Sequence, residues 1–141
     1  TTRRRTQVLG MNTYILDTHV LLWWLFNDVR LSYTAREIIK DSANDLLISA
    51  ASAWEIATKY RIGKLPEAVS VVQELPAYLR RARVKPLDIT VEDSLLAGSM
   101  NHAHRDPFDR MIIAQSKIRN LPVITNDPVL QQSGFGITTV F

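Results

Sequence analysis

Short apolar segments alternate with longer helical ones along almost the whole chain, and this alternation limits the possible folds most. Strands are predicted at residues 14–16, 46–49, 84–89, 122–125 and 137–140. Helices are predicted at 19–26, 33–42, 51–62 and 90–100, and from residue 106 onward. Strands joined through helices need right-handed crossovers, which give a mostly parallel sheet with helices on both faces. The expected fold class is α/β, a three-layer α/β/α sandwich.

Local signals support these boundaries. Ser32 is a suitable N-cap for the second helix, and Gly63 is a natural stop for the third. Thr90 and Asp93 have the spacing of a capping box at the start of a later helix. Pro86 cannot donate to a neighbouring strand, so it places the segment 84–89 near an edge of the sheet.

Acidic residues recur where a predicted strand gives way to a helix, or one turn into that helix. They are Asp17, Glu55, Asp109 and Asp127. In an open α/β sheet, sites form beyond the carboxyl ends of the strands. We therefore expect these four side chains, which are far apart in the sequence, to meet at one edge of the sheet.

Each acid also has a structural explanation. Asp106 and Asp127 both precede a proline, which is the pattern of an N-cap followed by the first helical residue. Asp17 can cap the helix that follows it, and Glu55 can pair with Lys59 at i,i+4 on an exposed surface. The joint pattern, rather than any single acid, indicates a site.

A shared acidic cluster needs a cation. Two like charges about 4 Å apart repel by roughly 4 kcal/mol at an effective dielectric constant of 20. Carboxylate oxygens favour magnesium or manganese over softer metals, and such a cation in an acidic cleft indicates cleavage of phosphodiesters. The pair His102 and His104 could bind zinc, but no third soft ligand lies near it in the sequence, so a helix-end role is preferred.

Composition excludes several classes of protein. The 141 residues suit one domain, and the absence of cysteine excludes disulfides and thiolate zinc sites. No apolar run reaches the length of about 20 residues that a membrane span needs. The first ten residues lack the apolar stretch of a signal peptide, so we expect a cytoplasmic protein.

The net charge of +3 comes entirely from the arginines at residues 3–5. Because Met11 is a natural start, residues 1–10 are expected to be a flexible extension or tag, and residues 11–141 the folded domain. A second basic group, at residues 80–85, is either a solvated surface or a patch that contacts phosphate.

Four segments together resemble the PIN domain, and specifically its VapC toxin subfamily, over residues 11–141. They are YILDTHVLLWWL, SAASAWEIATK, HRDPFDRMIIAQ and LPVITNDPVL. The resemblance implies a magnesium- or manganese-dependent ribonuclease that is inhibited by a small antitoxin protein and forms a homodimer. The metal-binding and catalytic residues that it implies are Asp17, Glu55, Asp109 and Asp127, with Asp106, Thr18 and Thr125 in supporting roles.

Two other functions compete with this hypothesis. In a non-catalytic interaction module the carboxylates would only cap helices, and exposed tryptophans could form a partner surface. Core packing is preferred for Trp23, Trp24 and Trp54. A phosphatase with an aspartyl nucleophile would need a second aspartate two residues after Asp17, where His19 stands. His19 itself could orient Asp17, but an ordinary, partly buried histidine is preferred.

Overall fold

Among the residues that the structure describes, the chain forms a five-stranded, fully parallel sheet in the order β3-β2-β1-β4-β5. The computed structural model describes residues 12–101 and 106–141. The predicted extension at 1–10 and the pair His102 and His104 therefore lie outside the described residues. The strands are β1 (Thr13–Leu16), β2 (Asp45–Ser49), β3 (Val84–Leu87), β4 (Val123–Ile124) and β5 (Thr139–Val140).

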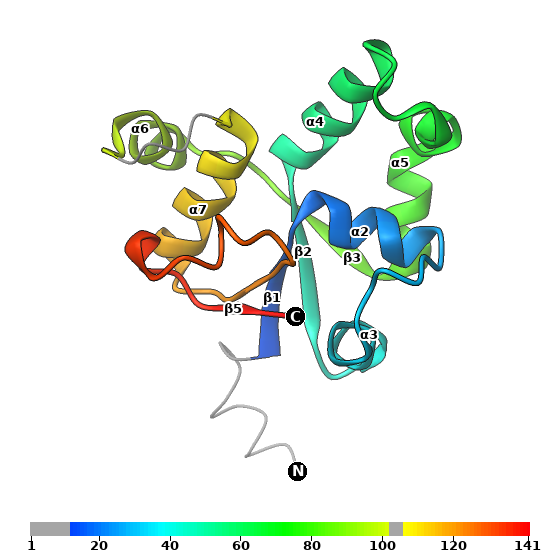
Figure 1. Cartoon of the computed structure of the whole chain (residues 1–141), viewed down its shortest axis with the longest axis horizontal. Coiled ribbons are helices and arrows are strands. Elements are labelled where there is room, and N and C mark those ends of the chain that lie inside the picture. Colours follow the sequence, from blue (N-terminus) through cyan, green and yellow to red (C-terminus); the bar gives the residue numbers. More distant parts are fainter. Residues whose placement is uncertain (1–11, 102–105) are drawn as a thin grey trace.

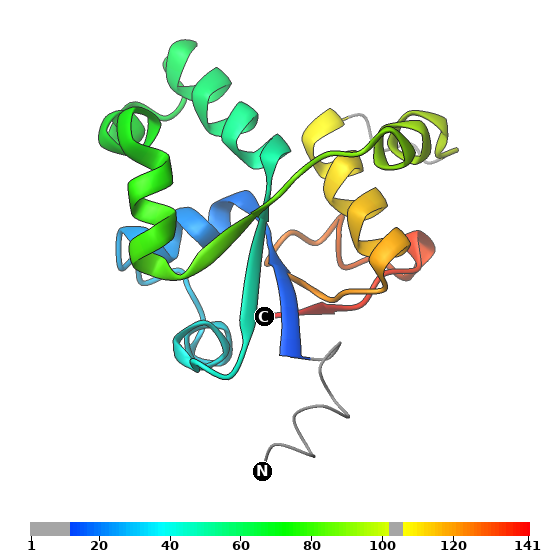
Figure 2. The same ribbon diagram turned by 180° about the vertical axis from the view of Figure 1, so that it is seen from behind.

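Helices cover both faces of this sheet (Figures 1 and 2). On one side lie α2 (Thr18–Leu25), α3 (Tyr33–Lys40), α4 (Ala50–Arg61) and α5 (Val69–Ala82). On the other lies α7 (Pro107–Arg119), with α6 (Val91–Ser99) packed against it. The predicted α/β/α sandwich is thus confirmed. In the described parts of the chain, none of the helices has the length and apolar character needed to cross a membrane.

Neighbouring residues of β1 show why the centre of the sheet is apolar on both faces. Leu16 packs into the core formed with α2 to α5, whereas Ile15 packs with Ile112 of α7 and Val123 of β4. Neither Ile15 nor Leu16 is exposed at all. Successive side chains of a strand point to opposite faces, so where a sheet is covered on both faces consecutive strand residues are apolar.

Several predicted boundaries change in the structure. The strands predicted at 122–125 and 137–140 shorten to two residues each. The third strand ends at Leu87 rather than at residue 89, and it does lie at the edge of the sheet. Pro76 lies within α5, and a kink occurs at Glu74 (φ −133°, ψ 30°). Because proline lacks an N–H group and crowds the preceding turn, it bends a helix rather than continuing it regularly.

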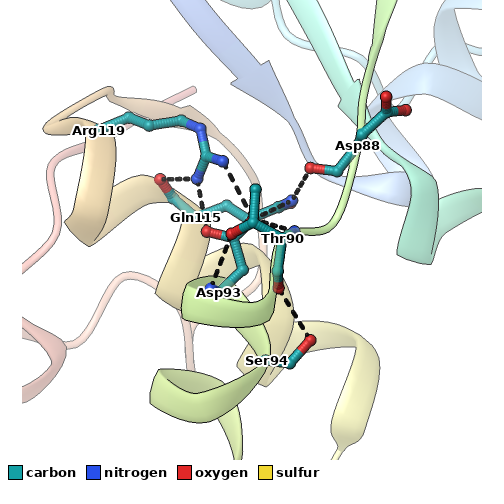
Figure 3. A network of polar contacts seen from close by, with 6 residues as sticks. All are labelled: Asp88, Thr90, Asp93, Ser94, Gln115 and Arg119. Atoms are coloured by element: carbon teal, nitrogen blue, oxygen red, sulfur yellow. Dashed lines mark hydrogen bonds and ion pairs between the residues drawn. The ribbon is translucent and has the colours of Figure 1, made fainter.

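A buried polar network joins α6 to α7 (Figure 3). The capping box is present, because the side chains of Thr90 and Asp93 each accept from the other's backbone amide. The fully buried Asp93 also accepts from the guanidinium of Arg119 at 2.8 and 3.0 Å and from the amide of Gln115 at 3.2 Å. Burial raises the pKa of Asp93, but these donors outweigh it and hold the pKa well below its usual value.

Candidate active site

A cleft of about 260 Å³ contains all four predicted acids and Asp106 as well, although Asp109 follows the helix α6 rather than a strand. Its lining residues are Asp17, His19, Val20, Trp23, Glu55, Lys59, Asp106, Asp109, Asn126, Asp127 and Pro128. These residues come from the ends of β1 and β4 and from the helices α2, α4 and α7. The carboxyl edge of the parallel sheet thus brings together acids that are widely separated in the sequence.

Asp17 lies directly after β1 and caps α2. Its Oδ1 accepts from the backbone amide of Thr18 at 2.7 Å, and its Oδ2 accepts from the hydroxyl of Thr125 at 2.7 Å. The residue is only 5% exposed. Burial raises the pKa of Asp17 above its usual value and repulsion by Glu55 adds to this, while the two hydrogen bonds and the nearby His19 oppose the change.

Glu55 lies in the second turn of α4 and is buried, with 3% of its surface exposed. The hydroxyl of Thr18 lies 2.6 Å from Oε1 of Glu55 and 2.8 Å from the hydroxyl of Ser52. Because a carboxylate only accepts, the proton of Thr18 is directed to Glu55. The ammonium of Lys59 pairs with Oε2. The i,i+4 pair with Lys59 is therefore present, but inside the cleft rather than on an exposed surface.

Asp106 and Asp127 each cap a backbone turn and also line the cleft, and Asp109 lines it as well. Oδ1 of Asp106 accepts from the amides of Phe108 and Asp109 at 2.9 and 3.3 Å, at the start of α7. Oδ1 of Asp127 accepts from the amide of Val129 at 2.9 Å. Asp109, in the first turn of α7, is buried. Capping and membership of an acidic cluster are therefore compatible at the same residues.

Lys59 is the cation that approaches the acids most directly among the lining residues. Burial lowers the pKa of its ammonium, but the hydrogen bond and charge of Glu55, together with the charges of Asp106 and Asp109, outweigh burial and raise it. Arg110, a basic residue of α7, donates to the carbonyls of Ala97 and Met100 near the end of α6.

The donor set of the cleft suits a hard divalent cation. Carboxylate oxygens predominate, and cysteine is absent from the sequence. Within the described parts of the chain, no three of these acids lie close enough together to hold a metal ion by themselves. Magnesium usually keeps several waters and needs only one or two direct carboxylates, so this spacing is compatible with it.

Sequence reasoning was wrong about two side chains. His19 is exposed at the cleft rather than partly buried, because Asp17 caps α2 and its first turn opens onto the site. Trp54 is 62% exposed and contacts the ring of Phe108 edge-on at 4.9 Å, so it is not a core residue. Trp23 and Trp24 do pack against the core, as expected. Asn126 also lines the cleft, and no sequence pattern had identified it.

The basic group at residues 80–85 lies away from the acids. It spans the end of α5 and the start of β3, which is the amino edge of the sheet. The cleft lies at the carboxyl edge, so these arginines and Lys85 do not line it. One of them, Arg81, stacks over the ring of Tyr78 at 4.8 Å.

Comparisons with known proteins agree with this architecture. The PIN domain profile matches residues 14–135. Ribonuclease VapC22 of Mycobacterium tuberculosis is 30% identical over 120 residues, which cover 83% of this chain and 88% of that protein. Ribonuclease VapC16 of the same organism is 42% identical over 69 residues, but these span only 49% of this chain and 41% of the relative.

Solved structures share the fold at lower identity. VapBC2 from Rickettsia felis, bound to a DNA fragment from its promoter, has a TM-score of 0.65 and 16% identity, covering 91% of this chain and 97% of that one. DNA-bound VapBC from Salmonella typhimurium has a TM-score of 0.64 and 20% identity, covering 91% and 96%. From the profile match, the VapC22 relative and the parallel sheet with acids at its carboxyl edge, we conclude that the chain belongs to the PIN domain family.

Proposed function

We propose that this protein is a divalent-metal-dependent endoribonuclease and the toxin of a toxin–antitoxin pair. The observation that carries the proposal is the meeting of Asp17, Glu55, Asp109 and Asp127 in one cleft at the carboxyl edge of the sheet. The ribonuclease names of two PIN-domain relatives support RNA as the substrate. Such an enzyme would act in the cytoplasm, where RNA is accessible.

The cation would be held by Asp17 and Asp109, with Glu55 and Asp127 binding it directly or through water. When bound, Mg²⁺ or Mn²⁺ would neutralise charge on the phosphodiester and make a water molecule a better nucleophile. The protein's own contribution is orientation. Thr125 and the amide of Thr18 fix both oxygens of Asp17, and the hydroxyl of Thr18 fixes Glu55. Groups held in this way need little rearrangement during the reaction.

The direct test compares RNA hydrolysis by the wild type and by Asp17→Asn, each with and without manganese. We expect metal-dependent cleavage by the wild type and a loss of at least about 100-fold in the variant, since metal-site groups contribute on this scale. Asp45→Asn is the matched control, because Asp45 is an exposed aspartate at the opposite edge of the sheet. Equal cleavage by the wild type and Asp17→Asn would refute the proposal.

A second test does not depend on activity. Magnesium that binds the folded state alone must raise the melting temperature. We expect this rise in the wild type and in Asp45→Asn but not in Asp17→Asn. A melting temperature that does not respond to magnesium or manganese in the wild type would favour the non-catalytic interaction module.

We further propose that the protein pairs with a small antitoxin and forms a homodimer. The antitoxin is supported by the structural likeness to two VapBC assemblies. Co-expression with its antitoxin, sought among small proteins encoded beside the gene, should give a stable complex in which RNA cleavage is suppressed. Sedimentation of the isolated protein tests the dimer, and a monomer at micromolar concentration would contradict that part of the proposal.

A further inference from the structure

The cleft has a second half that is aromatic and polar rather than acidic. One face of α2 contributes His19, Val20 and Trp23, and the turn after β4 contributes Asn126 and Pro128. His19 and Trp23 are four residues apart, so they lie about one helical turn, ~5.4 Å, from each other along α2. Asp17 caps the same helix, so the aromatic half begins directly beside the acids.

The Trp23 ring is held in a defined orientation. The guanidinium of Arg30 lies over it, 5.3 Å from the ring centre, and the ring of Phe141 meets it at 6.1 Å with an angle of 64°. The ring of His19 lies 6.2 Å away at an angle of 50°. Trp23 is thus packed against the core by part of its surface, while another part lines the cleft. A fixed aromatic ring loses little freedom when a planar ligand stacks on it.

The polar side chains of this half are not committed elsewhere. Among the described residues, the imidazole of His19 and the amide of Asn126 make no side-chain hydrogen bond, and both residues are exposed. The oxygens of Asp17 and Glu55, in contrast, are each held by a donor. An amide offers both donors and an acceptor, which is what the edge of a nucleobase requires.

We propose that His19, Trp23 and Asn126 form a nucleobase-binding subsite for single-stranded RNA, next to the phosphate-cleaving half of the cleft. The base stacks on Trp23, with the tilted ring of His19 beside it, and its edge is hydrogen-bonded by Asn126. Stacking on aromatic side chains is the usual way in which proteins hold unpaired bases. The inference rests on the proposed RNA substrate and adds to it the residues that position the nucleotide.

The test measures the affinity of a short single-stranded RNA and of copies that each lack one base. All proteins carry Asp17→Asn so that the RNA stays intact. With Trp23 present, we expect the loss of one particular base to weaken binding about tenfold, within the range for a single stacked base. This loss of RNA affinity on removal of one base is called the penalty below. In Trp23→Leu this penalty should disappear, and in Trp23→Tyr, which keeps an aromatic face, it should largely return.

Three further variants separate stacking from folding. Trp54→Leu removes an exposed tryptophan outside the cleft and should leave the penalty unchanged. His19→Ala changes an exposed side chain that is not part of the core, so it should lower the penalty without lowering the melting temperature. Asn126→Ala should alter the preference among the four bases at that position more than the overall affinity.

The inference is overturned if the penalty persists in Trp23→Leu, or if no single base matters when Trp23 is present. It is also overturned if Trp23→Leu binds RNA normally but binds a protein partner less tightly. Failure of the proposed function has a different outcome, in which the protein with an intact Asp17 neither cleaves RNA nor responds to metal. If the protein cleaves RNA with manganese but Trp23→Leu leaves its KM unchanged, the proposed function stands and only the proposed subsite is refuted.

Discussion

The hydroxyl of Thr125 donates to Oδ2 of Asp17 at 2.7 Å, although the two residues are 108 positions apart. The same oxygen of Thr125 accepts from the backbone amide of Asp127 at 3.0 Å. One buried hydroxyl at the end of β4 therefore orients one acid of the cleft and fixes the backbone of another. β1 and β4 are neighbours in the sheet, which brings these residues together.

Thr125→Val should weaken magnesium binding by about tenfold, the lower end of the range for residues that orient metal ligands. Valine keeps the shape of threonine but removes the donor to Asp17 and the acceptor for Asp127. Thr125→Ser keeps the hydroxyl and should restore most of the affinity. Calorimetric titration with magnesium measures both variants, and equal magnesium affinity in the valine and serine variants would contradict this role.

Thr18→Val should destabilise the protein by about 2 kcal/mol, the cost of leaving a buried charged acceptor without its donor. The acceptor is Oε1 of Glu55, which is buried in the cleft. Thr34→Val is the matched control, because Thr34 is exposed on α3. Urea unfolding measures both variants, and a loss of stability in Thr34→Val equal to that in Thr18→Val would show that the hydrogen bond to Glu55 is not the cause.

Asp17→Asn should stabilise the metal-free protein at neutral pH. The pKa of Asp17 is raised mainly by burial, so the folded protein binds its proton more tightly than the unfolded chain does. Stability therefore falls as the pH rises from the unfolded pKa of about 3.9 to the raised folded value, and it is level above that value. Asparagine removes this loss and keeps an acceptor for the amide of Thr18. Its Nδ2 cannot accept from the hydroxyl of Thr125, and the loss of this hydrogen bond makes the net gain in stability smaller.

Thermal unfolding in a chelator, from pH 4 to 8, tests this expectation. The difference in melting temperature between Asp17→Asn and the wild type should grow in favour of the variant by a few degrees as the pH rises, at about 3 °C for each kcal/mol of stability. Asp45→Asn, at the exposed start of β2, should follow the wild type. A melting temperature for Asp17→Asn that stays below that of the wild type at every pH would contradict the prediction.

Asp93→Asn should destabilise the protein by about 3 kcal/mol, because it breaks a buried pair with Arg119. The pKa of Asp93 lies below its unfolded value of about 3.9, so the stabilisation is complete above that pH and is lost as the pH falls below it. The variant should consequently lose less stability than the wild type between pH 4 and 2. Glu92→Gln, one residue away and exposed, should behave as the wild type in acid unfolding.

Local chemistry allowed much of the fold to be predicted. The alternation of apolar and helical segments indicated the sandwich, and Pro86 indicated the edge position of β3. The capping box of Thr90 and Asp93 followed from spacing alone. These features depend on residues close together in the sequence, where hydrogen-bond geometry and side-chain period decide the structure.

Only the tertiary structure decided how the acids are held. The sequence placed Asp17 and Asp127 at strand ends, but the link between them through Thr125 depends on which strands are neighbours. The exposure of His19 and Trp54 likewise depends on which helix face opens onto the cleft or the solvent. A sequence pattern specifies the faces of an element, whereas burial depends on what packs against each face, and that is set by contacts between distant parts of the chain.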